Sequence, residues 1–227
     1  QSWNDPYPAA DAGQNILYTV FTERPKHLDP AQSYTEDELA FTGQIYEPPL
    51  QYHYLKRPYE LMPATVEAVP QPRFFDAQGR ALPANAPAEL VAESVYELKL
   101  KPGIRFQPHP AFALDARGQA LYLGDNVADG RQVIADFPQS ASRELMADDY
   151  IYQIKRLAHP RLHSPIFGMM ADKIVGLKEL GEALGQAARK MPKDAWIDLD
   201  AYALSGVQKI DPQTWRIRIK GKYPQFL

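Results

Sequence analysis

The chain of 227 residues contains no cysteine. This absence excludes a disulfide framework, a thiolate metal site and a cysteine nucleophile. No run of about 18 apolar residues occurs, so no segment has the length and hydropathy of a membrane-spanning helix. Basic residues never form a block, and 25 Lys and Arg against 28 Asp and Glu give a formal net charge of −3. We therefore expect no nucleic-acid partner, because neutralising phosphates requires clustered cations.

The common nucleophile and phosphate-binding motifs are also missing. The sequence has no G-x-S-x-G, S-x-x-K or P-loop pattern. His159 and His163 are four residues apart, the spacing that puts two metal ligands on one face of a helix. Pro160 lies between them and ends a helix. We therefore expect neither a metal site nor a cofactor.

Paired carboxylates are the feature from which catalysis can be argued. The pairs are Glu36/Glu38, Asp148/Asp149 and Asp198/Asp200, and two such groups can carry out glycoside hydrolysis. A carboxylate-dependent hydrolase is therefore one alternative function. The two later pairs also suit a simpler interpretation, as the first turn of a helix and as part of a polar connection. We expect the chain not to be an enzyme.

Proline and apolar periodicity predict a mixed α/β or α+β fold with many irregular connections, since 21 residues are Pro. Asn15 to Thr22 is β-branched and aromatic, which predicts a largely buried strand. Thr35 or Asp37 can cap a helix that runs to about Tyr46. The later expected elements are a strand and then a loop over 50–70, two short strands around a turn at 76–79, a strand over 91–101, an irregular excursion over 107–146, a helix over 148–159, a helical stretch over 167–189 broken at Gly176 and Gly181, and a hairpin over 207–219.

The segment Ser33-Tyr34-Thr35-Glu36-Asp37 is a candidate binding loop. It lies between the first predicted strand and the start of the first predicted helix, where backbone N–H groups and side chains can meet a ligand. An ordinary cap and turn explains the same residues. From the loop alone, we favour that simpler interpretation.

Several segments in order resemble the family 5 extracellular solute-binding proteins, the oligopeptide and dipeptide receptors of ABC importers. The resemblance covers most of residues 15–227, although Pro48-Pro49 replaces the usual GL and the excursion over 107–146 is longer than the family's link. The segments that carry it are NILYTVFTERPKHLDP, ELAFTGQIYEPPL, LMPATVEAVP, YELKLKPGIRF, ADDYIYQIKRLAHP and GVQKIDPQTWRIRIKGKYPQFL.

The resemblance implies the N-terminal portion of a two-lobe fold of the class II periplasmic-binding-protein type, which closes on its ligand. Residues 1–14 would be a linker, 15–50 the first strand and helix of lobe I, and 51–227 its inserted subdomain. The second lobe would lie beyond Leu227, and the apolar ending over 223–227 also leads us to expect a receptor fragment.

The same resemblance implies a function. The protein would bind oligopeptides or murein-type peptides for import, as a monomer that docks on membrane permease subunits. It would be periplasmic or a membrane-anchored lipoprotein on the extracytoplasmic side. The alternatives within the family are receptors for nickel chelates, opines or oligosaccharides. The implied ligand contacts are Ser33, Tyr34, Thr35 and Glu36.

Overall fold

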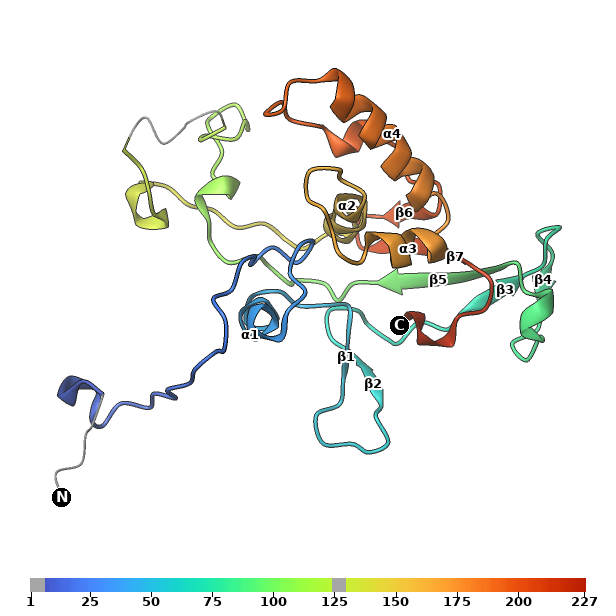
Figure 1. The fold of residues 1–227 in the computed structure, drawn as a ribbon, viewed down its shortest axis with the longest axis horizontal. Helices are drawn as coiled ribbons and strands as arrows, with labels where there is room; N and C mark the ends of the chain where they lie inside the picture. Colours follow the sequence, from blue (N-terminus) through green and yellow to red (C-terminus); the bar gives the residue numbers. More distant parts are fainter. Residues whose placement is uncertain (1–6, 124–129) are drawn as a thin grey trace.

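The structure is a computed structural model that describes residues 7–123 and 130–227. Within these residues it contains four α-helices and two antiparallel sheets, which confirms the mixed α+β prediction (Figure 1). The α-helices are α1 (Glu36–Ile45), α2 (Ala147–Leu157), α3 (Phe167–Lys173) and α4 (Leu177–Lys190). The strands are β1 (Leu50–Tyr52), β2 (Leu61–Pro63), β3 (Arg73–Phe75), β4 (Ala81–Leu82), β5 (Glu93–Lys99), β6 (Val207–Asp211) and β7 (Thr214–Lys220). Short 3₁₀ turns occupy Ala9–Asp11, Ala88–Leu90, Pro110–Phe112, Ile134–Asp136, Leu199–Ala201 and Pro224–Phe226.

The larger sheet has the strand order β4-β3-β5-β7-β6, with every pair antiparallel. Its two central strands, β5 and β7, are more than a hundred residues apart in the chain. Their register places Leu98 opposite Trp215 and Tyr96 opposite Ile217. Because side chains alternate between the faces of a strand, these apolar residues share one face of the sheet.

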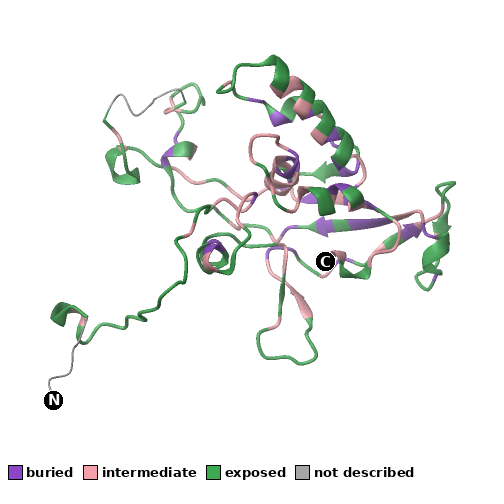
Figure 2. Ribbon diagram, in the orientation of Figure 1, coloured by how far each residue is buried: buried purple, intermediate pink, exposed green. Residues whose placement is uncertain are grey.

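Helices α2, α3 and α4 cover that apolar face, and the main core lies between the two layers. Helix α4 contributes a stripe of buried leucines, Leu177, Leu180 and Leu184, at the spacing expected of an amphipathic helix. Trp215 is 1% exposed and is the largest fully buried side chain. Figure 2 shows the same distribution, with buried residues along the sheet and exposed residues along the outer side of α4.

Tyr150 of α2 joins the helix layer to the sheet and to the N-terminal third of the chain. Its ring stacks on Trp215, with centroids 5.0 Å apart and planes 12° apart. Its hydroxyl donates to the carbonyl of Glu47 at 2.9 Å and lies 2.7 Å from the hydroxyl of Thr65. Burial raises the pKa of the Tyr150 phenol, so the group stays protonated and able to donate at physiological pH.

Glycine divides the helical stretch over 167–190 at one predicted position and not at the other. Gly176 has a φ of +80°, a conformation that favours glycine, and separates α3 from α4 as expected. The predicted break at Gly181 is wrong, because this residue lies inside α4. A Cβ atom at Gly181 would overlap the ring of Phe167 in α3. The glycine therefore allows the two helices to pack closely.

The predicted buried strand over 15–22 is also wrong. In the structure Asn15 to Thr22 is extended, but it pairs with no strand of the described chain, and all eight residues are exposed. Leu17 and Val20 are 90% and 91% exposed. A strand requires partners for its backbone N–H and C=O groups, and neither sheet presents an edge to this segment, which runs away from the body of the molecule (Figure 1).

Most other expected elements are confirmed. The turn at 76–79 joins β3 to β4, and β6 and β7 form the predicted C-terminal hairpin. The segment over 50–70 differs from its prediction, since β1 and β2 pair in a two-stranded hairpin where we expected one strand and a loop. In the described part of the excursion over 107–146, short turns and isolated bridges replace regular elements.

Two glycines within α4 provide a matched test of the helix packing. Replacing Gly181 with Ala should destabilise the fold by about 1–3 kcal/mol, because the new methyl group overlaps the Phe167 ring. Replacing Gly185 with Ala should stabilise it by up to about 1 kcal/mol, because a Cβ there meets only the end of the Arg189 side chain at 4.0 Å. Urea unfolding of both variants measures the difference. Equal effects would contradict the close approach of α3 to α4.

Removing the Tyr150 hydroxyl tests the junction between α2 and the N-terminal third. Tyr150→Phe should lower the free energy of unfolding by about 1–2 kcal/mol, because the stack on Trp215 is kept and the hydrogen bond to Glu47 is lost. Tyr152→Phe on the same helix is the control, since among the described residues burial and nearby charges, and no hydrogen bond, act on the Tyr152 hydroxyl. The melting temperature should fall for Tyr150→Phe and stay unchanged for Tyr152→Phe.

Candidate functional site

A single carboxylate, that of Glu38, accepts hydrogen bonds from the backbone of the candidate binding loop. One of its oxygens accepts the backbone N–H groups of Lys26 at 3.0 Å and His27 at 2.9 Å. The other accepts those of Tyr34 at 2.9 Å and Thr35 at 3.2 Å. Glu38 is 2% exposed. It therefore links the loop, at Tyr34 and Thr35, to the upstream segment at Lys26 and His27.

The sequence T-x-x-E produces this arrangement. Thr35 is the N-cap of α1, and its hydroxyl accepts the N–H of Glu38 at 3.3 Å, which completes a capping box. Hydrogen bonds from backbone N–H groups, that of Tyr34 first among them, lower the pKa of the Glu38 carboxyl to about 2. The carboxylate is therefore ionised whenever the loop is folded near neutral pH.

A second anchor attaches the loop to α2. Asp29 forms a two-pronged ion pair with Arg156, one contact of which is 2.9 Å. The Asp29 carbonyl also accepts the N–H groups of Gln32 and Ser33, and the Gln32 side chain reaches the carbonyl of Leu162 at 3.0 Å. Burial by itself raises the pKa of Asp29, but the Arg156 hydrogen bond and the other nearby donors hold it below its ordinary value.

The four residues predicted to contact the ligand differ in exposure and in the polar groups that are free to bind it. Ser33 is half-buried, whereas Tyr34, Thr35 and Glu36 are exposed, Tyr34 to 74%. The Thr35 hydroxyl is engaged in the cap. The Tyr34 phenol can stack and hydrogen-bond, and the Glu36 carboxylate can accept hydrogen bonds. The loop thus presents polar groups on a fixed backbone, an arrangement suited to binding.

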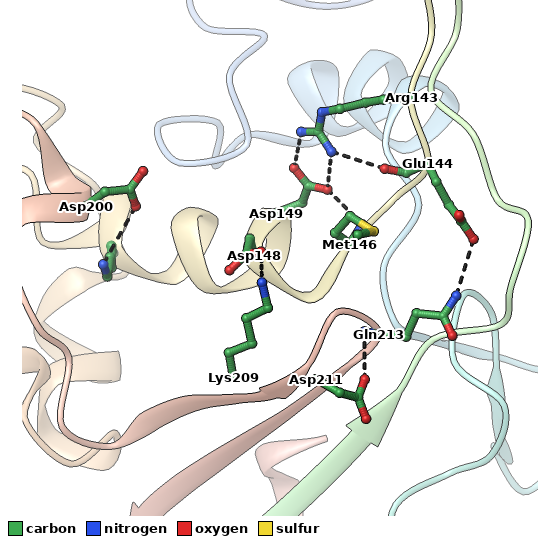
Figure 3. Close-up of polar contacts among 10 residues, drawn as sticks. Arg143, Glu144, Met146, Asp148, Asp149, Asp200, Lys209, Asp211 and Gln213 are labelled. Carbon is green, nitrogen blue, oxygen red and sulfur yellow. Dashed lines mark hydrogen bonds and ion pairs between the residues drawn. The ribbon is translucent and has the colours of Figure 1, made fainter.

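The carboxylates of the pair Asp148/Asp149 are engaged in ion pairs and a cap. Figure 3 shows Asp149 between Arg143 and the start of α2, where it receives two guanidinium contacts of 2.9 and 2.5 Å and the N–H of Met146 at 2.9 Å. Asp148 pairs with Lys209 of β6 at 2.5 Å. These contacts attach α2 to its neighbours, as expected for acidic residues in a first turn.

The third pair and the two spaced histidines have similar local roles. Asp198 accepts the N–H of Asp200 at 3.0 Å and caps a 3₁₀ turn. His159 follows α2 and accepts the N–H of Arg161 at 3.2 Å, and burial, then the charge of Arg161, lowers its pKa. His163 has a φ of +50° beyond Pro160. The chain therefore turns between the two histidines, as the proline predicts.

No group of three or more His, Asp or Glu side chains in residues 7–123 and 130–227 is arranged to hold a metal ion. None of the helices in the same residues is long and apolar enough to cross a membrane.

Sequence reasoning identified the loop but not the residues that position it. Glu38 could have been found, since Thr35 and Glu38 have the spacing of a capping box. The pairing of Asp29 with Arg156 has no local signal, because 127 positions separate the two residues.

Comparison with known proteins gave no match: no family model, no curated protein and no solved structure is similar to this chain.

The loop anchor predicts a specific dependence of stability on pH. Because the folded-state pKa of Glu38 is about 2 and lies below the ordinary value of 4.5, its contribution is fully present above about pH 4.5 and is lost as the pH falls toward 2. Glu38→Gln should therefore be less stable than wild type at pH 7, and the difference should narrow over this window. Urea unfolding at several pH values measures it.

Glu36→Gln provides the matched control, since Glu36 is exposed on the same helical turn. The control variant should unfold like wild type throughout the pH range. A Glu38→Gln variant that unfolds like Glu36→Gln would contradict the assignment of Glu38 as the loop anchor.

Proposed function

We propose that the chain is part of the extracytoplasmic substrate-binding component of an ABC importer and that it binds peptides, either oligopeptides or murein-type peptides. It would deliver them as a monomer to membrane permease subunits, from the periplasm or from a lipid anchor. In this proposal residues 15–50 and 51–227 belong to one lobe of a two-lobe fold of the class II type.

The observation that carries the proposal is the convergence of the receptor-like motifs in space. Tyr150 belongs to ADDYIYQIKRLAHP, and its hydroxyl contacts Glu47 of ELAFTGQIYEPPL and Thr65 of LMPATVEAVP. Its ring stacks on Trp215 in the last motif. Asp29 of the LDP turn pairs with Arg156 of the same helix. Motifs that are weak singly thus form one connected structure.

The pairing of β5 with β7 extends this argument. YELKLKPGIRF supplies residues 96–99 of β5 and GVQKIDPQTWRIRIKGKYPQFL supplies β6 and β7, so four of the seven residue pairs between β5 and β7 join the two motifs. The order of the motifs and the contacts between them are the support for the proposal.

The exposed segment over 15–22 supports a larger architecture. It is uncharged and β-prone, and its backbone forms no ladder with any described strand. Leaving such a segment in water is unfavourable, because its apolar side chains and its backbone both gain from a sheet partner. We propose that it pairs within the sheet of the lobe and places the anchored loop beside the ligand.

Peptide-induced stabilisation tests the proposal. A peptide library should raise the melting temperature of the natural full-length protein, since a ligand at a hundredfold excess over its Kd adds about 2.7 kcal/mol. Tyr34→Ala should weaken the effect, because the exposed phenol is the largest group on the loop. Tyr54→Ala is the control, since Tyr54 is 87% exposed on the β1–β2 hairpin. Differential scanning fluorimetry measures all three proteins.

Other ligands distinguish the competing functions. If nickel chelates, opines or oligosaccharides stabilise the protein and peptides do not, the protein is still a transport receptor, but its ligand is not a peptide. Turnover of a glycoside that disappears in Asp148→Asn or Asp149→Asn would overturn the receptor proposal in favour of a hydrolase.

A further inference from the structure

The face of the large sheet that points away from the helices carries a row of charged side chains. The register of β5 and β7 places Glu97 opposite Arg216 and Val95 opposite Arg218. Next to this row, under the β3–β4 hairpin, lies a depression of about 470 Å³. The residues that matter for its chemistry are Arg73, Phe75, Glu93, Gln208, Arg216 and Arg218.

The cations in this depression exceed the anions available to neutralise them. Glu93 is fully engaged by Arg218, through two contacts of 2.9 and 2.8 Å. Glu97 is shared, since one of its oxygens contacts Arg216 at 2.8 Å and Arg73 at 3.6 Å. Three guanidinium groups thus face two carboxylates. Asp76 also lines the depression but does not restore the balance, because Arg80 pairs with it at 2.6 Å.

Two of the guanidinium groups also retain unused hydrogen-bonding capacity. The distance of 3.6 Å between Arg73 and Glu97 is longer than a hydrogen bond. The Nε atom of Arg216 is buried and has no hydrogen-bond partner among the described residues. The Nε atom itself is out of reach of a ligand, so an acidic group from outside would contact the exposed parts of the two guanidinium groups; the Arg73 side chain is 56% exposed and that of Arg216 32%.

We propose that this depression binds a small organic anion through a carboxylate or phosphate group that sits between Arg73 and Arg216. Guanidinium groups bind both kinds of acid through paired hydrogen bonds. The two arginines come from β3 and β7, which β5 holds in register, so their positions are set before a ligand arrives. Phe75 provides an apolar side wall.

This site is separate from the anchored loop. The β3–β4 hairpin lies at the opposite end of the large sheet from α1, which begins at the loop (Figure 1). Anion binding in the depression therefore does not depend on peptide binding at the loop, and the two proposals can fail independently.

Calorimetric titration with succinate and with inorganic phosphate tests the proposal, with neutral glycerol as the reference. Succinate or phosphate should bind, and Arg73→Gln should weaken the binding by about tenfold or more, because it removes a charge-assisted contact. Arg73→Lys should also weaken it, since lysine keeps the charge but loses the fork. The lower dissociation constant of the two, for succinate or for phosphate, shows whether the site prefers a carboxylate or a phosphate group.

Lys178→Gln is the matched control, because Lys178 is exposed on α4, on the other face of the sheet, and the change alters the net charge equally. It should alter binding less than twofold, which is the expectation for screened surface charge. Arg216→Gln gives a second test of the same site, with circular dichroism to confirm its fold. No binding of either anion at millimolar concentration, or equal losses in Arg73→Gln and Lys178→Gln, would overturn the proposal.

Discussion

The stack of Tyr150 on Trp215 is the contact on which the arrangement of the chain depends. The pair joins the first turn of α2 to the central strand β7, and a buried aromatic pair contributes about 0.5–1.5 kcal/mol beyond its buried area. The same tyrosine hydroxyl bonds to Glu47 and contacts Thr65. One side chain thus connects the helix layer, the sheet and the segments that follow α1. A change here would loosen elements from three distant parts of the sequence.

The loop before α1 shows how local and long-range forces are combined. Glu38 organises it through four backbone hydrogen bonds, which need only neighbouring residues and a capping sequence. Asp29 attaches it to α2 through Arg156, which needs the tertiary fold. The loop is therefore held by hydrogen bonds and an ion pair, whereas the apolar segment over 15–22 is exposed to solvent. That contrast is the physical basis for the proposal that the segment pairs with a sheet.

The two faces of the large sheet have opposite chemistry. Alternation along β7 sends Trp215, Ile217 and Ile219 into the core and leaves Arg216 and Arg218 on the open face. On the covered face the packing of helices supplies the stability. On the open face, cross-strand ion pairs satisfy most of the charge but leave an excess of guanidinium groups. The same alternation that builds the core therefore creates the proposed anion site.

The sequence by itself determined the elements whose signals are local: the capped helix α1, the turn between β3 and β4, helix α2 with its acidic first turn, and the C-terminal hairpin. It also indicated the candidate loop. Only the tertiary structure decided that Gly181 continues a helix, because its close neighbour Phe167 comes from another helix. The exposure of residues 15–22, the pairing of β5 with β7 and the contact of Asp29 with Arg156 were decided in the same way. Each depends on which distant partner is present, and local propensity carries no information about distant partners.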